Sequence, residues 1–457
     1  MNGSFFGELL QTISDRGRAL LERARDRRGA DSTRSESLIE LADHLLSGRG
    51  EASGVALARE ILGRYAELTT GPRIAFFEAL AERFGPDPTR MEKAIAAWRE
   101  QPNDETAAEV HAASEPRRQE LFRRLNLAPG GTAALVRMRE QLVEVLAHRD
   151  DDLGQVDADF VHLFSSWFNR GFLVLRRIDW STPAIVLEKL IRYEAVHEIR
   201  GWDDLRRRID PPDRRCYAFF HPALVDEPLI FVEVAITREI PGAIAPILAS
   251  GRQQFVEPDK ARIATFYSIS NCQRGLAGVS FGNFLIKQVV EEICRELPRL
   301  TTFVTLSPVP GFAQWLTREI KAENSSINQS DRITLELLER PHWWTDPETF
   351  GQLEDPLMRA AAWYFLRAKN ARGLPVDPVA RFHLGNGARL ERINWLGDTS
   401  DKAIAQGYGL MVNYQYDLGD IEKNHEAYAQ QRTVVASGAV TKLARTNGRE
   451  VVVPAAG

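Results

Sequence analysis

The sequence predicts an α+β protein of more than one domain, in which an all-α helical bundle precedes an α/β domain with a mixed sheet. Three observations predict this fold class. Apolar residues recur at helical spacing through about the first 170 residues, β-branched and aromatic runs dominate later, and one strand is followed by a long amphipathic helix and a second strand. Because 457 residues exceed one ordinary hydrophobic core, we expect two or three domains.

The first part of the chain reads as helix after helix. Apolar side chains keep helical spacing at Leu38, Leu41 and Leu45, and again at Ile74, Phe77, Leu80 and Phe84. Glycine and proline breaks separate these helices at 48–50, 85–88 and 129–131. We therefore assign residues 1–190 to a helical domain, whose expected role is packing or oligomerisation.

Strand signals dominate the second part, which we assign to a domain of residues 191–457. Strands are expected at 216–220, 229–236, 263–269, 302–306 and 410–416, and residues 172–175 fit either a strand or a helix end. Helices are expected at 281–297, at 310–320 with Pro310 in its first position, and at 356–369. Strands on both sides of a helix predict an α/β domain with a mixed sheet.

Composition excludes several classes of protein. A net charge of −5 gives no reason to expect a nucleic-acid binder. Cys216, Cys272 and Cys294 have neither disulfide-framework nor zinc-site spacing, and no metal site of the HExxH kind occurs. No apolar run approaches the length of a transmembrane helix, and the arginine-bearing start carries too many acids for a transit peptide. We expect a cytoplasmic protein with no metal and no membrane.

The stretch 262–312 organises the second domain. A strand feeds a glycine-bearing turn and then a helix, whose first backbone N–H groups are unpaired and suit a phosphate or diphosphate. Neither GxGxxG nor GxxxxGK[ST] is present, which argues against the dinucleotide-fold and phosphate-loop classes. The turn resembles in part the acyl-coenzyme A loop of the Gcn5-related N-acetyltransferase fold. The candidate binding residues are Ala277, Gly278, Val279, Ser280, Phe281, Gly282 and Asn283. A glycine-bearing helix entry packed on a sheet would look the same.

Two polar residues in longer strings are candidates for chemistry. Ser307 lies in Leu-Ser-Pro-Val-Pro-Gly-Phe and His383 in Phe-His-Leu-Gly-Asn-Gly-Ala. Taken singly, a serine before proline commonly starts a turn or caps a helix. A histidine among apolar neighbours is equally well a buried structural residue.

Taken together and in order, these strings resemble the malonyl-CoA decarboxylase family. The others are Asn-Cys-Gln-Arg-Gly-Leu-Ala-Gly-Val from Asn271 and Arg-Ile-Asn-Trp from Arg392. The resemblance implies a helical oligomerisation domain, a catalytic domain of the acetyltransferase fold, and conversion of malonyl-CoA to acetyl-CoA and CO2. It places the family's catalytic pair on Ser307 and His383 and its substrate loop on 277–283. Ser280 stands where relatives can carry glutamate.

The chemistry of this reaction suits the two residues. Loss of CO2 from a malonyl thioester leaves an enolate, which the thioester itself stabilises, so no metal, biotin or pyridoxal is required. We expect Ser307 to bind the malonyl carboxylate or relay a proton, and His383 to act as general acid, on the premise that an imidazole pKa lies near the working pH. Tyr416 is a candidate supporting hydroxyl, with structural burial as the alternative. Arg274 or Lys287 would add charge near the diphosphate.

Three other functions remain open on the sequence alone. The same fold could carry an acyl-CoA-dependent N-acetyltransferase, in which Ser307 and His383 serve amine attack. It could also be a non-catalytic coenzyme A sensor whose helical half recruits a partner. A thioester hydrolase is a further reading, although no GxSxG elbow is present.

Overall fold

The computed structural model describes residues 32–48, 50–148, 153–252, 254–279, 281 and 285–445. The chain forms two compact units. Unit 1 comprises Met1–Leu173 with two later segments, His221–Val225 and Gln273–Phe281. Unit 2 comprises Val174–Phe220, Asp226–Cys272 and Gly282–Gly457.

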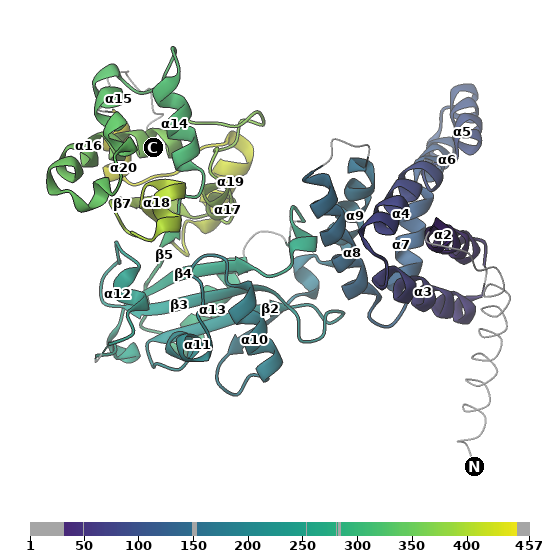
Figure 1. The fold of residues 1–457 in the computed structure, drawn as a ribbon, viewed down its shortest axis with the longest axis horizontal. Coiled ribbons are helices and arrows are strands. Elements are labelled where there is room, and N and C mark those ends of the chain that lie inside the picture. Colours follow the sequence, from purple (N-terminus) through teal and green to yellow (C-terminus); the bar gives the residue numbers. More distant parts are fainter. Residues whose placement is uncertain are drawn as a thin grey trace. The chain divides into compact units, whose positions relative to one another are not determined.

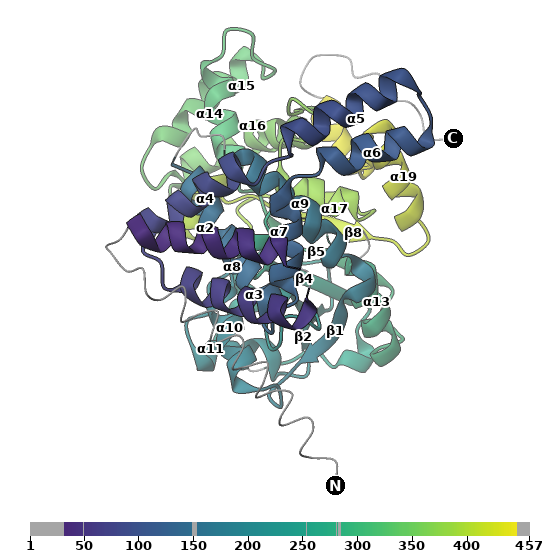
Figure 2. The same ribbon diagram turned by 90° about the vertical axis from the view of Figure 1, so that its right-hand side faces the viewer.

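Unit 1 is helical throughout its described part. Its helices are α2 (Ser32–Ser47), α3 (Glu51–Ala66), α4 (Thr70–Arg83), α5 (Pro88–Glu100), α6 (Asp104–Ser114), α7 (Arg117–Asn126), α8 (Gly131–Leu146), α9 (Gly154–Trp167) and the 3₁₀ turns η1 (Arg170–Phe172) and η3 (Arg274–Leu276). Helices α5 and α6 lie side by side as a hairpin (Figures 1 and 2). The side chains of Asp87 and Asn103 cap the N-termini of α5 and α6 by accepting hydrogen bonds from backbone N–H groups of the first turn, so each helix begins directly after a polar residue.

The core of unit 1 is aromatic. Phe122 stacks on Phe160 with ring centroids 4.1 Å apart, and Phe164 follows one turn later at 5.5 Å. All three rings are fully buried. Aromatic pairs of this kind add to the gain from burying apolar surface, so the apolar periodicity that predicts the helices also supplies their shared core.

Unit 2 is built on an eight-stranded sheet of order β1-β2-β3-β4-β5-β8-β6, with β7 pairing β8 beside this path. The strands are β1 (Val174–Ile178), β2 (Arg214–Phe220), β3 (Pro228–Thr237), β4 (Ile263–Asn271), β5 (Thr302–Thr305), β6 (Ser307–Pro308), β7 (Arg389–Asn394) and β8 (Met411–Tyr416). Among the strands that the structure describes, only β4 and β5 pair in parallel, and a parallel pair needs a crossover, which α13 (Leu285–Glu296) supplies. The sheet is mixed, and the predicted fold class is confirmed.

Helices form most of the remainder of unit 2. They are α10 (Ala184–Tyr193), α11 (Trp202–Ile209), α12 (Ala245–Leu248), α14 (Phe312–Lys321), α15 (Gln329–Leu335), α16 (Pro347–Leu366), α17 (Pro378–Gly385), α18 (Asp401–Gly407), α19 (Ile421–Gln431) and α20 (Gly438–Arg445), with 3₁₀ turns η2 (Pro258–Lys260), η4 (Glu336–Glu339) and η5 (Trp343–Thr345). Helices α10, α11 and α13 lie beside strands β2 to β4, and α14 to α20 gather near β7 (Figure 1). No helix in the described ranges is long and apolar enough to cross a membrane.

Three local predictions differ from the structure. The helix expected from Pro356 begins at Pro347, because the buried face that includes Leu353 and Leu357 continues across Pro356. The helix expected from Pro310 begins at Phe312, after Gly311 as its N-cap. The helix expected over 281–297 is described only from Leu285 to Glu296.

The domain boundary predicted between residues 190 and 191 remains a prediction. The compact units divide instead between Leu173 and Val174. Val174 begins β1, which pairs antiparallel with β2 over its whole length and so belongs with the sheet. Residues 172–175 therefore include a strand start, one of the two alternatives for that segment.

Candidate active site

Ser307 is a strand residue and does not cap a helix. It lies on β6 opposite Val412 of β8, and its Oγ donates a hydrogen bond to Thr305 Oγ1 at 2.9 Å. Thr305 Oγ1 also accepts from the backbone N–H of Tyr414 at 3.1 Å. The hydroxyl is thus fixed between two neighbouring strands.

His383 reaches the same place from helix α17. The Asp377 side chain caps this helix by accepting from the Ala380 N–H at 2.8 Å. After the helix, Gly387 adopts φ 82°, and a Cβ there would lie 2.1 Å from the Ile421 carbonyl oxygen. Only glycine fits this turn, which sends the chain from α17 into β7 and fixes the end of the helix that carries His383.

Ser307, His383 and Tyr416 form one chain of hydrogen bonds, called the catalytic chain below. His383 Nε2 lies 3.1 Å from Ser307 Oγ, and His383 Nδ1 lies 2.8 Å from the Tyr416 hydroxyl. The three residues are only 6%, 2% and 1% exposed. The Tyr414 ring stacks on the imidazole at 4.6 Å. The three predicted catalytic residues are therefore together in unit 2, and their roles remain predictions.

Burial keeps the three residues of the catalytic chain uncharged. It lowers the pKa of His383 from 6.5 to about 3 and raises the pKa of Tyr416 well above 10.0. The premise that the His383 pKa lies near the working pH is therefore wrong, because no charged partner offsets the loss of solvation. A neutral imidazole donates from one nitrogen and accepts at the other. Since Ser307 gives its single hydrogen to Thr305, Nε2 donates to Ser307 and Nδ1 accepts from Tyr416.

The predicted coenzyme loop belongs to unit 1 as far as Phe281. Ala277 and Gly278 are exposed, Gly278 has φ 77°, and Val279 and Phe281 are buried. Ser280, Gly282 and Asn283 lie outside the described residues. Of the two cations expected nearby, Arg274 is exposed, while Lys287 forms an ion pair with Glu422 at 3.0 Å.

Two residues of this environment escaped the sequence reasoning, namely Thr305 and Tyr414. Both could have been found from strand periodicity. Thr305 precedes Ser307 by two residues and Tyr414 precedes Tyr416 by two, and alternate strand residues share a face of the sheet. This rule places the Thr305 side chain on the same face as Ser307, and the Tyr414 side chain on the same face as Tyr416.

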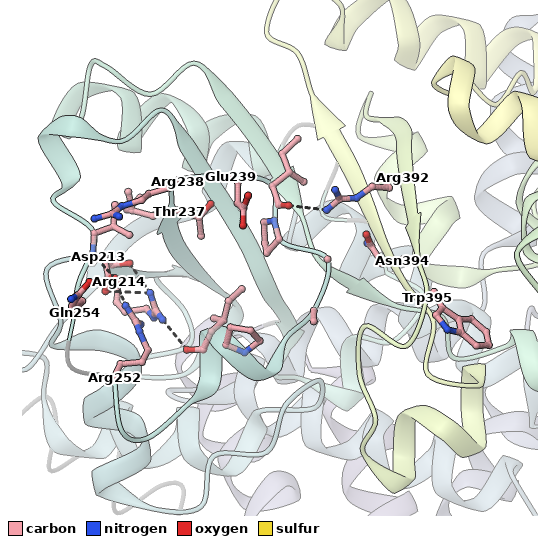
Figure 3. A pocket seen from close by; sticks show the side chains of 18 of the residues that line it. Asp213, Arg214, Thr237, Arg238, Glu239, Arg252, Gln254, Arg392, Asn394 and Trp395 are labelled. Atoms are coloured by element: carbon pink, nitrogen blue, oxygen red, sulfur yellow. Dashed lines mark hydrogen bonds and ion pairs between the residues drawn. The ribbon is translucent and has the colours of Figure 1, made fainter. Parts of the chain in front are cut away.

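A separate cavity of about 880 Å³ lies in unit 2 between the end of β3 and β7 (Figure 3). Arg392 crosses it, donating to the Ile240 carbonyl at 2.8 Å and to Asn413 Oδ1 at 3.0 Å. Arg214 and Arg252 both pair with the buried Asp213. The other charged lining residues are Arg238, Arg392, Glu239 and Glu354, so four arginines and three carboxylates line the cavity and its formal charge is +1. None of the three predicted catalytic residues lines it.

Within the described ranges, no three or more His, Cys, Asp or Glu side chains are grouped so that they could hold a metal ion. Cys216, Cys272 and Cys294 are all free, and the first two are buried. Burial raises the pKa of the Cys216 and Cys272 thiols well above 9.0, which makes both poor nucleophiles.

Comparison with known proteins gives a consistent result. The family model of the malonyl-CoA decarboxylase C-terminal domain matches residues 171–453, and that of the N-terminal domain matches residues 84–168. The crystal structure of malonyl-CoA decarboxylase from Rhodopseudomonas palustris is 59% identical, with a TM-score of 0.86 over 89% of this chain and 99% of that chain. The enzyme from Agrobacterium vitis is 56% identical, with a TM-score of 0.84 and the same coverage. Mitochondrial malonyl-CoA decarboxylase of Anser anser anser is 38% identical over 83% of this chain and 81% of that protein.

Proposed function

Because the chain belongs to the malonyl-CoA decarboxylase family and is thus a carboxy-lyase, we propose that it converts malonyl-CoA to acetyl-CoA and CO2 through the catalytic chain, with no metal or organic cofactor. The observation that supports this best is the continuous run of hydrogen bonds from Ser307 through His383 to Tyr416. Such a run can carry a proton to a substrate carbon at the Ser307 end.

The reaction requires one bond to break and one to form. The bond between the malonyl carboxylate and the α-carbon breaks, CO2 leaves, and the electron pair stays on the α-carbon and is delocalised onto the thioester oxygen. The thioester is therefore the electron sink, and the protein needs only to favour the enolate and deliver a proton. Ser307 is the residue that we assign to contact the substrate.

The neutral state of His383 determines how the proton moves. Ser307 gives its hydroxyl hydrogen to the α-carbon, takes the Nε2 hydrogen of His383, and His383 takes the Tyr416 hydrogen at Nδ1. The ring thus exchanges one tautomer for the other and never becomes a cation, which the buried site would disfavour. The negative charge of the enolate ends on the Tyr416 oxygen, where burial disfavours it, so the transfer depends on the α-carbanion being a stronger base than this phenolate. Uptake of one proton from solvent, with return of the ring hydrogen from Nδ1 to Nε2, restores the resting state.

The coenzyme part of the substrate is assigned to the loop at 277–283. Backbone N–H groups at this turn and at the following helix start would bind the diphosphate. The exposed Arg274 is the nearby cation in the sequence that has room to help, because Lys287 is engaged by Glu422. We propose no separate cofactor, since coenzyme A arrives as part of the substrate.

Incubation of the purified protein with malonyl-CoA alone, in the presence of a metal chelator, tests this function. We expect CO2 and acetyl-CoA to form in equal amounts with no acceptor present. Release of malonate and free coenzyme A would instead indicate a hydrolase, and a requirement for an amine would indicate an N-acetyltransferase. Binding of malonyl-CoA with no product would leave only a coenzyme A sensor.

We also propose self-association through the helical domain and a cytoplasmic location. Both rest on the sequence, and the goose relative carries a mitochondrial name. Light scattering of the purified chain would test the first proposal, because a monomer at micromolar concentration contradicts it. Fractionation of the source cells would test the second.

A further inference from the structure

The coenzyme loop, counted here with the turn η3 (Arg274–Leu276) that leads into it, packs against helix α8 of the helical bundle through η3. Gly275 is buried there, and a Cβ on it would lie 2.0 Å from the Val136 carbonyl oxygen. No other amino acid fits so close to a helix backbone. The next residue, Leu276, is fully buried. The loop therefore rests on the helix through its own backbone.

One buried side chain joins the loop to the bundle. Arg139 of α8 is 3% exposed, and its Nη1 donates to the Gly275 carbonyl oxygen at 2.8 Å. Its Nε donates to Asp157 Oδ1 at 2.8 Å and its Nη2 to Asp157 Oδ2 at 3.4 Å. The carboxylate of α9 thus orients the guanidinium, and the guanidinium holds the loop carbonyl.

From these contacts we propose that helix α8 is part of the coenzyme-binding apparatus, with Arg139 as the positioning residue for the loop that receives coenzyme A. This assignment rests on the proposed function. It gives the helical unit a direct part in substrate binding in addition to packing or self-association. Arg139 touches neither the coenzyme nor the reacting atoms in this scheme. It acts by fixing the backbone at Gly275, from which the loop continues to the exposed residues Ala277 and Gly278.

The same unit contains a matched control. Arg118 of α7 is also 3% exposed and pairs with Asp159 of α9, two residues along from Asp157. Its remaining contact is to the Leu80 carbonyl of α4 at 3.4 Å, away from the loop. Both arginines are buried and both pair with an aspartate of α9, but only Arg139 reaches the coenzyme loop.

The test compares Arg139→Met with Arg118→Met in the full chain. Both variants should lose thermal stability, since each leaves an aspartate of α9 without its cation. Only Arg139→Met should raise the KM for malonyl-CoA, by about tenfold, and weaken binding of free coenzyme A by a similar factor, with kcat within about twofold of the parent. Arg139→Lys should lie between the parent and Arg139→Met, because an ammonium group lacks the fork that serves two partners.

The results separate this assignment from the proposed function. A parent protein that releases no CO2 from malonyl-CoA refutes the proposed function. An active parent with equal KM changes in Arg139→Met and Arg118→Met, or a loss confined to kcat, refutes the role of Arg139 alone. If Arg139→Met does not fold, Gly275→Ala serves in its place, because the added Cβ must displace the loop from Val136. A KM rise supports the assignment and an unchanged KM overturns it.

Discussion

Unit 2 contains two buried polar arrays that differ in how well their groups are satisfied. In the catalytic chain every hydroxyl and ring nitrogen has a hydrogen-bond partner. The second array, called the glutamate cluster, is made of His197, Arg208, Glu233 and Tyr267. In it, Arg208 donates to Glu233 Oε2 at 3.2 Å and to the His197 carbonyl at 2.8 Å. Four polar atoms of that cluster have no hydrogen-bond partner among the described residues, namely His197 Nε2, Arg208 Nε, Glu233 Oε1 and the Tyr267 hydroxyl.

The difference shows two uses of buried polarity. The catalytic chain is neutral, so burial costs it little once its hydrogen bonds are made, and those bonds select one tautomer of His383. The glutamate cluster buries a charged pair with hydrogen-bonding capacity left over, which is costly. Burial accordingly raises the pKa of Glu233 from 4.5 to about 8. We expect the first array to control the rate and the second to control how stability depends on pH.

The largest expected effect is on turnover. Ser307→Ala and His383→Asn should each lower kcat by a factor on the order of a hundred or more, because each removes a group that carries the proton. Glu233→Gln should leave kcat within about threefold, since only one array takes part in the chemistry. Steady-state rates of acetyl-CoA formation measure all three. Equal losses in His383→Asn and Glu233→Gln would break the division between the arrays.

A smaller effect is expected from the two tyrosines, which form a matched pair. Tyr416 and Tyr267 are both 1% exposed, but of these two hydroxyls only that of Tyr416 has a hydrogen-bond partner among the described residues. Tyr416→Phe should lower kcat by about tenfold or more, because Nδ1 of His383 loses the donor that fixes its tautomer and supplies the hydrogen of the relay. Tyr267→Phe should leave kcat unchanged and should not destabilise the protein, because it removes a buried hydroxyl that is unsatisfied. A large loss of activity in Tyr267→Phe would show that the glutamate cluster takes part in the mechanism.

Much of this arrangement could be predicted from the sequence. Apolar spacing gave the helices of unit 1, β-branched runs gave β2 to β5, and the strings around Ser307 and His383 pointed to two residues that the fold brings within 3.1 Å. Gly387 belongs to the same string as His383, and the nearby Ile421 carbonyl leaves no room there for a Cβ. A steric constraint of this kind decides which residue type can occupy the position, so it is visible in the local sequence.

The remainder depends on contacts between distant parts of the chain. No local signal shows that Gly275 rests on Val136, because the contact joins a loop to a helix far earlier in the sequence. The charge state of His383 is set by burial in the folded core, whereas the sequence suggested an ordinary imidazole. Pro356 was read as a helix start, yet apolar packing on both sides keeps it inside α16. Tertiary packing overrides local preference in each case.

The pH dependence of stability should reveal the glutamate cluster. Because folding raises the Glu233 pKa, the folded state holds the Glu233 proton more tightly than the unfolded state does. The contribution of Glu233 to the free energy of unfolding is therefore greatest below pH 4.5 and is lost as the pH rises to about 8. Urea unfolding between these limits should show the free energy of unfolding falling by at most about 1.4 kcal/mol per pH unit from this group. Glu233→Gln should flatten that slope, and an unchanged slope would show that Glu233 is ionised throughout.

The catalytic chain should contribute a trend of the opposite sign, at lower pH. Folding lowers the pKa of His383 from 6.5 to about 3, so its stabilising contribution is present above pH 6.5 and is lost as the pH falls towards 3. His383→Asn should remove part of this acid-side loss. The remainder should persist because His197, whose pKa burial lowers to about 4, has the same sign. Urea unfolding of His383→Asn and His197→Asn between pH 3 and 6.5 separates the two histidines. If His383→Asn leaves the acid-side slope unchanged, the imidazole is protonated within the folded protein, and proton delivery must then pass through a cation.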